Sequence, residues 1–198
     1  MVIISDVDRM VFMKNILVGL GNPGEKYQLT RHNLGFMFLD FLLLKYHLEQ
    51  FSFKNKLQTE LSINSNLVLV KPQTFMNLSG EAVSKVLNFY GDSGSSMAQL
   101  ANEYLFVAHD DLDIKFGEFK IQLATGPKDH NGLSSIYQHL NTMDFWHIRI
   151  GSDDRDGNRQ IPSEKYVLQS LESVQLRVLE EVFEKIVAQL IERKILSF

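Results

Sequence analysis

His32 is the residue in this sequence best suited to act as a general base. It stands at the end of the segment GLGNPGEKYQLTRHN, just before a stretch with helical periodicity. An imidazole has a reference pKa of about 6.5, so near neutral pH much of it is unprotonated and can accept a proton from water. A lone histidine at a helix start is more often structural. The catalytic interpretation therefore requires an acceptor that orients the ring.

The segment VAHDDLD offers that acceptor. Side chains alternate along a strand, so His109 and Asp110 face opposite sides and only one of them is expected to reach a given site. Asp110, following a buried strand, would fix the tautomer of His32 as in a His–carboxylate dyad. Asp111 and Asp113 fit a solvated acidic turn. Alternatively, this cluster suits a hard cation, with ligands from His109, Asp110, Asp111 and Asp113.

Three asparagines, Asn22, Asn77 and Asn131, flank the predicted elements at similar places. Asn22 precedes a proline in a tight turn, and Asn131 is suited to cap a helix, so each has a purely local interpretation. Asn77 has no evident structural role, because Ser79 is the expected N-cap. An amide both donates and accepts hydrogen bonds and can hold a water or a carbonyl. Together with the His–Asp pair, these amides predict a site at the carboxyl ends of the strands.

The segment GLGNPG has the glycine spacing of a dinucleotide-binding turn. That fingerprint needs a helix that begins at the glycines and an acidic residue at the end of the next strand. Here Pro23 and Gly24 precede a delay of about ten residues before the helix. Asp40, the acid nearest the expected distance, falls within that helix. The sequence thus disfavours a nucleotide, and we expect no cofactor.

Alternating strands and helices are predicted to position these residues. Strands are expected at 15–20, 58–63, 67–71, 104–108, 117–123 and 146–150, and helices at 33–48, 79–90, 133–140 and 172–195. The segments 91–102 and 152–160 are expected to be loops, the first of them mobile. This alternation predicts an α/β fold with a largely parallel or mixed sheet and helices on both faces.

Composition limits the classes of protein that fit. The 198 residues are 44 % hydrophobic and suffice for one domain, predicted at 14–198 after an N-terminal appendage at 1–13. The absence of cysteine excludes a thiolate nucleophile and a Cys-ligated zinc, and fits a reducing cytoplasm. No apolar run reaches the ~20 residues that span a membrane. With a net charge of −4, RNA binding would depend on a local basic patch.

Five stretches resemble, in order and spacing, the bacterial peptidyl-tRNA hydrolases: ILVGLGNPGEKYQLTRHNLGF, KPQTFMNLSGEAV, FVAHDDLD, HNGL and FWHIRIG. The similarity covers about residues 14–198. It implies a single globular α/β domain, phosphorylase/hydrolase-like, with a twisted mixed sheet. It also implies a monomeric cytoplasmic enzyme that uses water and no metal. The substrate would be peptidyl-tRNA, cut at the ester between the peptide C-terminus and the terminal ribose.

The resemblance also implies roles for single residues. His32 would be the general base and Asp110 its orienting partner, while Asn22 would hold the substrate near the attacking water. Four further residues would bind the peptide. Asn77 and Asn131 would contact its carbonyl and backbone, and Tyr27 and Met76 would line the groove of the enzyme that receives it.

The sequence departs from the family pattern where tRNA phosphates would be held. The usual glycine-rich, histidine-containing stretch before HNG reads ATGPKD here, and the basic residue expected two positions before Ala124 is Gln122. The loop after Arg149 is acidic, SDDRD. Phosphate contacts are still predicted for Lys120 and Arg149, with Lys128 as a substitute for the missing base.

Three other functions remain open from the sequence. A non-catalytic RNA-binding relative would be expected to lack the His–Asp–Asn set, which this chain retains. A metal-dependent phosphoesterase would use the HDDLD cluster, and a nucleotide-dependent oxidoreductase would use GLGNPG.

Overall fold

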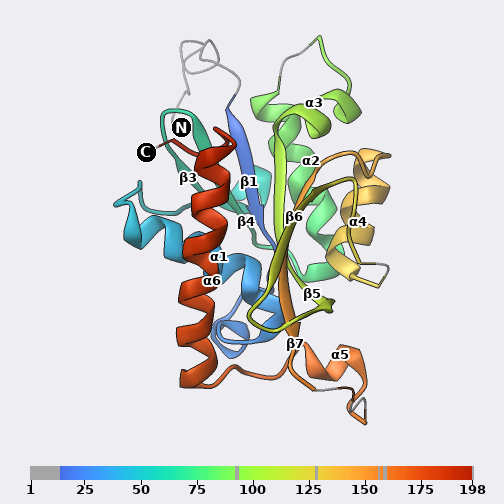
Figure 1. Cartoon of the computed structure of the whole chain (residues 1–198). Coiled ribbons are helices and arrows are strands. Elements are labelled where there is room, and N and C mark those ends of the chain that lie inside the picture. The colour runs from blue at the N-terminus through green and yellow to red at the C-terminus, as the bar shows by residue number, and fades with distance from the viewer. Residues whose placement is uncertain (1–13, 92–93, 128, 156, 158–159, 198) are drawn as a thin grey trace.

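A mixed sheet of seven strands runs through the described part of the chain, residues 14–91, 94–127, 129–155, 157 and 160–197 of a computed structural model (Figure 1). The strands are β1 (Asn15–Gly19), β2 (Ser52–Lys54), β3 (Thr59–Ile63), β4 (Leu67–Pro72), β5 (Leu105–Lys115), β6 (Phe119–Leu123) and β7 (Trp146–Asp153). Their order across the sheet is β2-β3-β4-β1-β5-β7-β6. The central strands β4, β1, β5 and β7 are parallel neighbours, and the pairs β2–β3, β3–β4 and β6–β7 are antiparallel.

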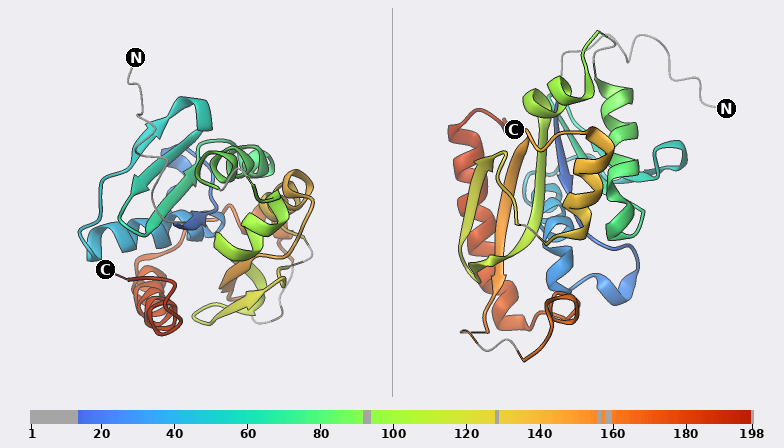
Figure 2. Two further views of the ribbon diagram at one scale, coloured as in Figure 1. Left: turned by 90° about the horizontal axis from the view of Figure 1, so that it is seen from above. Right: turned by 90° about the vertical axis from the view of Figure 1, so that its right-hand side faces the viewer.

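Helices cover both faces of this sheet (Figure 2). On one face lie α1 (Leu34–Lys45) and α6 (Ser173–Glu192), and on the other α2 (Ser79–Tyr90), α3 (Met97–Tyr104) and α4 (Asn131–Leu140). The short α5 (Ser163–Tyr166) follows β7, and single turns of 3-10 helix occur at η2 (Glu25–Tyr27), η3 (Arg31–Asn33), η4 (Asn55–Leu57) and η5 (Met76–Leu78). The predicted α/β fold, with a mixed sheet and helices on both faces, is confirmed.

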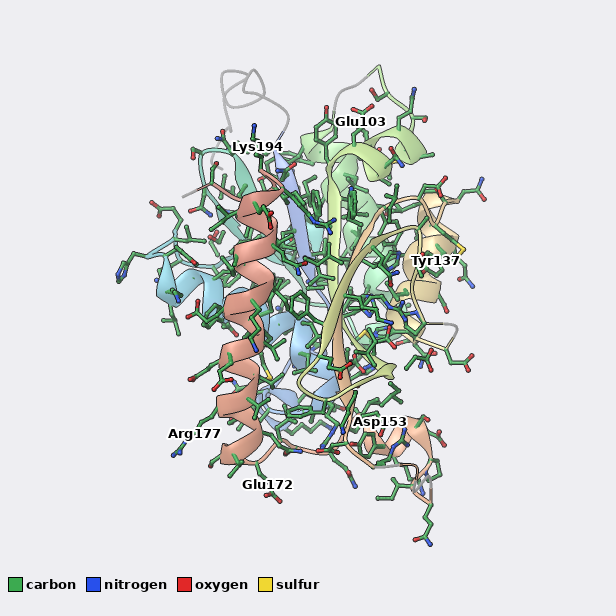
Figure 3. The ribbon with its side chains drawn as sticks, viewed as in Figure 1. Glu103, Tyr137, Asp153, Glu172, Arg177 and Lys194 are labelled. Carbon is green, nitrogen blue, oxygen red and sulfur yellow. The ribbon has the colours of Figure 1, made fainter. Side chains whose placement is uncertain are left out.

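Each face of the sheet has its own apolar core. Along β1, Leu17 packs toward α1 and α6, whereas Ile16 and Val18 pack toward α2 and α4. This alternation is what a strand buried on both faces requires, and it explains why β1 reads as an unbroken apolar run. Charged residues such as Glu103, Glu172, Arg177 and Lys194 are exposed and lie at the outside of the molecule (Figure 3).

The start of α1 is pressed against the ends of β1 and β5. A Cβ on Gly35 would overlap the carbonyl oxygen of Ala108 and the backbone of Leu20, so only glycine permits this approach. The backbone of the preceding turn is held by the C-terminal segment, since the amide of His32 donates to the carbonyl of Val167 at 2.8 Å. The close approach at Gly35 and the hydrogen bond to Val167 together hold His32 at the carboxyl end of β1.

Three predicted boundaries were wrong, and one of them is the end of β7, which continues to Asp153 and so into the loop expected at 152–160. The segment 91–102 was expected to be a loop, but α3 begins at Met97 and is capped by reciprocal hydrogen bonds between Ser96 and Gln99. This capping box is visible in the sequence as Ser-x-x-Gln and was overlooked. The strand expected at 104–108 continues to Lys115, so Asp110 lies within β5 rather than after it.

Two predictions fall on residues outside the described ranges, the appendage at 1–13 and the phosphate contact of Lys128. Among the described helices, none combines the length and the apolar character needed to cross a membrane.

Candidate active site

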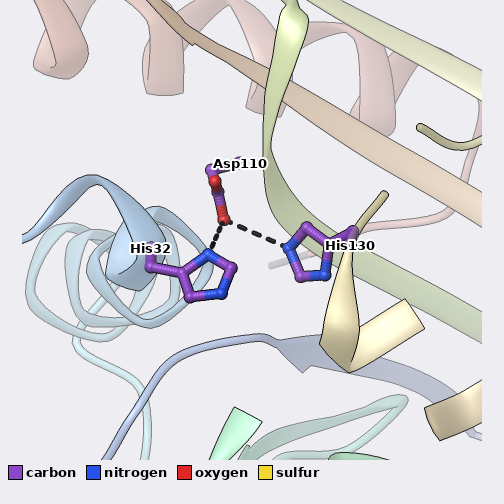
Figure 4. A group of neighbouring side chains, drawn as sticks. All are labelled: His32, Asp110 and His130. Carbon is purple, nitrogen blue, oxygen red and sulfur yellow. Dashed lines mark hydrogen bonds and ion pairs between the residues drawn. The ribbon is translucent and has the colours of Figure 1, made fainter. Parts of the chain in front are cut away.

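His32 and Asp110, 78 residues apart in the chain, meet at the carboxyl end of β1 (Figure 4). His32 Nδ1 lies 2.8 Å from Asp110 Oδ1. An ionised carboxylate only accepts hydrogen bonds, so Nδ1 carries the proton and Nε2 carries the lone pair. Nε2 makes no hydrogen bond to any described residue, and His32 lines a cleft. The imidazole is therefore held in the tautomer that a general base needs.

A second imidazole contacts the same carboxylate oxygen. His130 Nε2 donates to Asp110 Oδ1 at 3.1 Å, while His130 Nδ1 accepts the amide of Leu133 at 3.3 Å (Figure 4). His130, not Asn131, is thus the N-cap of α4, and Asn131 is the exposed first residue of the helix. The role of His130 was missed from the sequence, although its place directly before the helical pattern of α4 is a usable signal.

The charges of this cluster support one another. Burial by itself would raise the pKa of Asp110, but His32 and His130 outweigh it and hold that pKa well below its usual range. Burial would lower the pKa of His32, but the ion pair and hydrogen bond with Asp110 outweigh it and raise that pKa. Asp110 is consequently ionised near neutral pH, and His32 is a stronger base than a free imidazole.

Topology explains why groups from three elements converge on Asp110. β1 pairs with β5 only as far as Ala108, so beyond that residue the space beside β5 is open on the β1 side. From β1 the chain passes through α1 toward β4, and from β5 it passes toward β7 and β6. This is a switch point, at whose carboxyl edge α/β proteins place their sites.

A cleft of about 550 Å³ opens at this edge. Its volume suits part of a small-molecule or peptide substrate. The cleft is lined by His32, Asp110, Leu112, Asp113, Pro127, Asp129, His130, Asn131, Ser134, Arg155, Ser163, Glu164 and Val167. Four of these are carboxylates and one is an arginine, so the cleft disfavours a phosphate at its floor.

Of the predicted site residues, Asn131 lines the cleft with His32 and Asp110, whereas Asn22, Tyr27, Met76 and Asn77 do not. Met76 is buried, with its sulfur against Gly132. Asn77 is exposed on η5, and Tyr27 is half-buried on η2.

Asn22 has a structural role that its turn position did not reveal. Its Oδ1 accepts the amide of Met76 at 2.9 Å, which ties the turn after β1 to η5. Asn33 holds the other side of this turn, because its Oδ1 accepts the amide of Asn22 at 2.8 Å and its Nδ2 donates to the carbonyl of Asn22 at 3.0 Å. Within the described residues, Asn22 Nδ2 is left without a hydrogen bond and can donate to a substrate.

The other acidic residues of HDDLD do not gather around one point. Asp111 was expected in a solvated turn, but it is buried and binds Arg149 Nε at 2.7 Å. Arg149, on the neighbouring strand β7, neutralises the charge of the Asp111 carboxylate. His109 is buried on the opposite side from Asp110, as the strand alternation predicts, and contacts His147. The cation site proposed for His109, Asp110, Asp111 and Asp113 is therefore wrong.

Another set of donors could hold a metal. One nitrogen each of His32 and His130 and one oxygen of Asp110 lie within 4.8 Å of one another. Two imidazoles and a carboxylate suit a divalent cation. Both nitrogens, however, already bind Asp110 through hydrogen bonds, so a cation would have to displace two protons.

Two of the predicted phosphate contacts, Lys120 and Arg149, do not line the cleft. Lys120 is exposed on β6, next to Arg149 in the β6–β7 register. Arg149 is buried, and its Nη1 donates to Gln122 Oε1 at 2.8 Å in addition to the Asp111 pair. Gln122 stands where a basic residue was expected. Its side chain accepts a hydrogen bond from Arg149, so that Arg149 Nη1 is used within the protein.

Contacts of the Tyr166 ring connect one wall of the cleft with the segment that carries His32. The ring of Tyr166 on α5 lies between the guanidinium groups of Arg31 and Arg155, at 4.5 and 4.2 Å. Arg31 also pairs with Asp154 at 3.0 Å, and the Tyr166 hydroxyl bonds to the same carboxylate. The polar loop predicted at 152–160 therefore has a packing role that its composition did not reveal.

Comparison with known proteins now places the chain. A family model described as peptidyl-tRNA hydrolase matches residues 16–196. The chain belongs to the peptidyl-tRNA hydrolase family. It is 38 % identical over 180 residues to the peptidyl-tRNA hydrolase of Lawsonia intracellularis, covering 88 % of this chain and 84 % of that protein. The corresponding protein of Bacillus subtilis is 36 % identical over 172 residues, 86 % of each chain.

A solved structure of a peptidyl-tRNA hydrolase, from Acinetobacter baumannii, superposes with a TM-score of 0.73 at 30 % identity, covering 88 % of this chain and 85 % of that one. The resemblance stated from the sequence motifs is therefore confirmed, as is the class of enzyme, a hydrolase of the peptidyl-tRNA hydrolase family.

Proposed function

We propose that this protein hydrolyses the ester between the peptide C-terminus and the terminal ribose of peptidyl-tRNA, with water activated by His32 and no covalent intermediate. Membership in the peptidyl-tRNA hydrolase family supports the substrate. The observation that carries the mechanism is the His32 Nδ1–Asp110 bond of 2.8 Å, which leaves Nε2 available at the cleft. The protein acts as a cytoplasmic monomer in this proposal.

In the proposed reaction, His32 Nε2 removes a proton from water as the water oxygen attacks the ester carbonyl. The tetrahedral intermediate then collapses, the bond to the ribose oxygen breaks, and the imidazolium returns its proton to that oxygen. Asp110 remains ionised and stabilises the imidazolium. A ribose hydroxyl is a better leaving group than an amine, so no nucleophilic side chain is needed.

The amides would supply the remaining stabilisation. Asn131 lines the cleft and can bind the peptidyl carbonyl or backbone. The Asn22 Oδ1 already accepts the amide of Met76, so Asn22 would hold the substrate near the attacking water chiefly by donating from Nδ2. Exposed Asn77 and half-buried Tyr27 would extend the peptide site, with Met76 supporting η5 from below. Removing one preorganised donor typically costs 10²–10³ in kcat.

Phosphates of the tRNA would bind outside the acidic cleft. Lys120 is exposed and is the first candidate. Arg149 uses Nε and Nη1 within the protein, so its contribution would come from Nη2. Lys128, which precedes Asp129 at the cleft, is the third candidate.

The function is tested with an N-acetylaminoacyl-tRNA as substrate, in a rapid-quench time course with and without chelator. Free tRNA and the free N-acetylamino acid should appear together, at the same rate in both arms. A burst of tRNA ahead of the acid would indicate a covalent intermediate, and loss of activity with chelator would favour the His32–Asp110–His130 metal site. No hydrolysis at all would refute the function.

The pH dependence of kcat/KM should show an acid limb above the ordinary histidine pKa of about 6.5, because Asp110 raises the pKa of His32. The base must be neutral, so activity is present above this pKa and is lost as the pH falls through it. A limb at or below the ordinary histidine pKa would contradict the ionised Asp110 partner. The measurement uses the same substrate, with enzyme stability checked at each pH.

A further inference from the structure

Two buried imidazoles lie behind Asp110 and have no part in the proposed reaction. His109 on β5 and His147 on β7 each have 0 % of their surface exposed. His109 Nδ1 lies 2.9 Å from the backbone carbonyl oxygen of Asp110, and His147 Nδ1 lies 3.3 Å from His109 Nε2. The two rings therefore form a continuous chain from β7 to the residue that orients His32.

The direction of the hydrogen bonds in this chain follows from its ends. Burial lowers the pKa of His109 well below its usual value, and burial with the nearby Arg149 charge lowers the pKa of His147 to about 4. Both rings are thus neutral, and each has one donor and one acceptor nitrogen. The carbonyl of Asp110 only accepts, so His109 Nδ1 donates to it, and His109 Nε2 accepts the proton of His147 Nδ1.

The buried ring of His109 also packs against His130, the second imidazole that binds the Asp110 carboxylate. The ring of His109 meets those of His130 and His147 edge to face, at centroid distances of 5.3 and 5.5 Å. The ring of His147 in turn stacks on Phe145 at 4.5 Å. His109 thus touches both the main chain of Asp110 and the imidazole that shares its carboxylate.

Two buried histidines stabilise this part of the core less than apolar side chains would. His147 Nε2 is buried and has no hydrogen-bond partner in the described residues, while the ring also interacts with the backbone of Met143, which raises its pKa against the effect of burial. An unpaired buried polar atom destabilises a fold, whereas an apolar side chain at the same position would not. The neighbouring Ile148 and Ile150 show that β7 buries aliphatic side chains. What an aliphatic residue could not supply is a donor toward His109.

At Asp110 the main chain of β5 has a partner strand on one side only. It stays in register with Ile150 of β7, but β1 pairs with β5 only as far as Ala108. Asp110 must nevertheless hold its carboxylate within hydrogen-bond distance of both His32 and His130.

We propose that His147 and His109 are positioning residues, which fix the main chain at Asp110 by a relay of donated hydrogen bonds and so hold its carboxylate against His32. The proposal rests on the general-base function proposed for His32. It separates from that function experimentally, because failure of the relay would leave the wild-type enzyme active and dependent on His32.

The relay is tested by three variants. His147→Leu removes the donor, His147→Asn keeps a donor at the branch position of Nδ1, and Ile148→Val perturbs the same strand from its opposite, aliphatic face. A displacement of the base should lower kcat of His147→Leu roughly ten- to a hundred-fold with KM unchanged. The acid limb of kcat/KM should shift to lower pH, because Asp110 no longer raises the pKa of His32 fully. His147→Asn should restore most of kcat and the limb, and Ile148→Val should alter only thermal stability.

Three results would overturn the proposal. The first is a folded His147→Leu enzyme with wild-type kcat and acid limb. The second is equal loss in the Leu and Asn variants. The third is nitrogen chemical shifts in the wild type that place the His109 proton on Nε2. If His147→Leu does not fold, His109→Asn and His109→Leu give the second test. The side-chain amide introduced by His109→Asn can donate to the Asp110 carbonyl, so this variant should keep the acid limb at the wild-type pH. His109→Leu has no such donor, and its acid limb should shift to lower pH.

Discussion

His32→Ala should lower kcat for hydrolysis of an N-acetylaminoacyl-tRNA by about 10²–10⁴-fold, the usual contribution of a general base. KM should change little, because the variant removes the group that acts on water and leaves the acidic cleft walls and the amides in place. The residual rate would come from binding and from amide donors that stabilise the developing oxyanion. Rates are measured under single-turnover conditions, so that product release does not mask the chemical step.

His139→Ala is the matched control. His139 is exposed on α4, and its Nδ1 bonds to the carbonyl of Ser135, away from the cleft residues. This variant should keep wild-type kcat. If His32→Ala keeps it as well, while remaining folded by circular dichroism and thermal melting, His32 is not the base and the mechanism proposed here is wrong.

Asp110→Asn is expected to have a comparable effect, a loss of kcat of up to about 10⁴-fold, as the same change of the orienting aspartate has in serine proteases. The neutral amide no longer stabilises the imidazolium that forms during the reaction. An amide nitrogen facing His32 would also donate to Nδ1, which moves the imidazole proton to Nε2 and blocks the base. His130 would at the same time lose the ionised acceptor of its Nε2 hydrogen bond.

The loss of charge also predicts a change in the pH profile of Asp110→Asn. Asp110 raises the pKa of His32, so any remaining activity should extend to lower pH than in the wild type. Asp144→Asn, at an exposed position outside the cleft, is the charge-matched control and should behave as wild type. A variant with an unshifted acid limb and a small loss of kcat would show that Asp110 does not hold the tautomer.

The cleft charges bear on how the substrate enters. Asp113, Asp129 and Glu164 line the cleft beside the reactive pair, and Arg155 is already paired with Asp153 at 2.8 Å. A polyanion is repelled from such a surface. In the proposed function, only the acyl end of the substrate enters this cleft, while basic residues outside the cleft bind the tRNA backbone.

The local features of this protein follow from the order of its amino acids. The apolar run of β1, the stripe of α6 and the alternation of strands with helices follow from periodicity, and they predict the fold class because short-range burial patterns decide element type. His32 and Asp110 could be chosen from residue type and from their place next to predicted strands. The motif order then placed the chain in its family.

The pairing of the polar groups, by contrast, depends on how the elements are arranged in space. His130 shares the carboxylate of Asp110, and Asn33 holds the turn at Asn22, through contacts that no local pattern encodes. Asp111 seemed solvated but is buried, since the strand register brings Arg149 beside it. The physical reason is that burial and neutralisation of a charge depend on its neighbours in space, and these are set by strand order and register. His32 became a plausible base through one such neighbour, and the relay behind Asp110 became visible through two more.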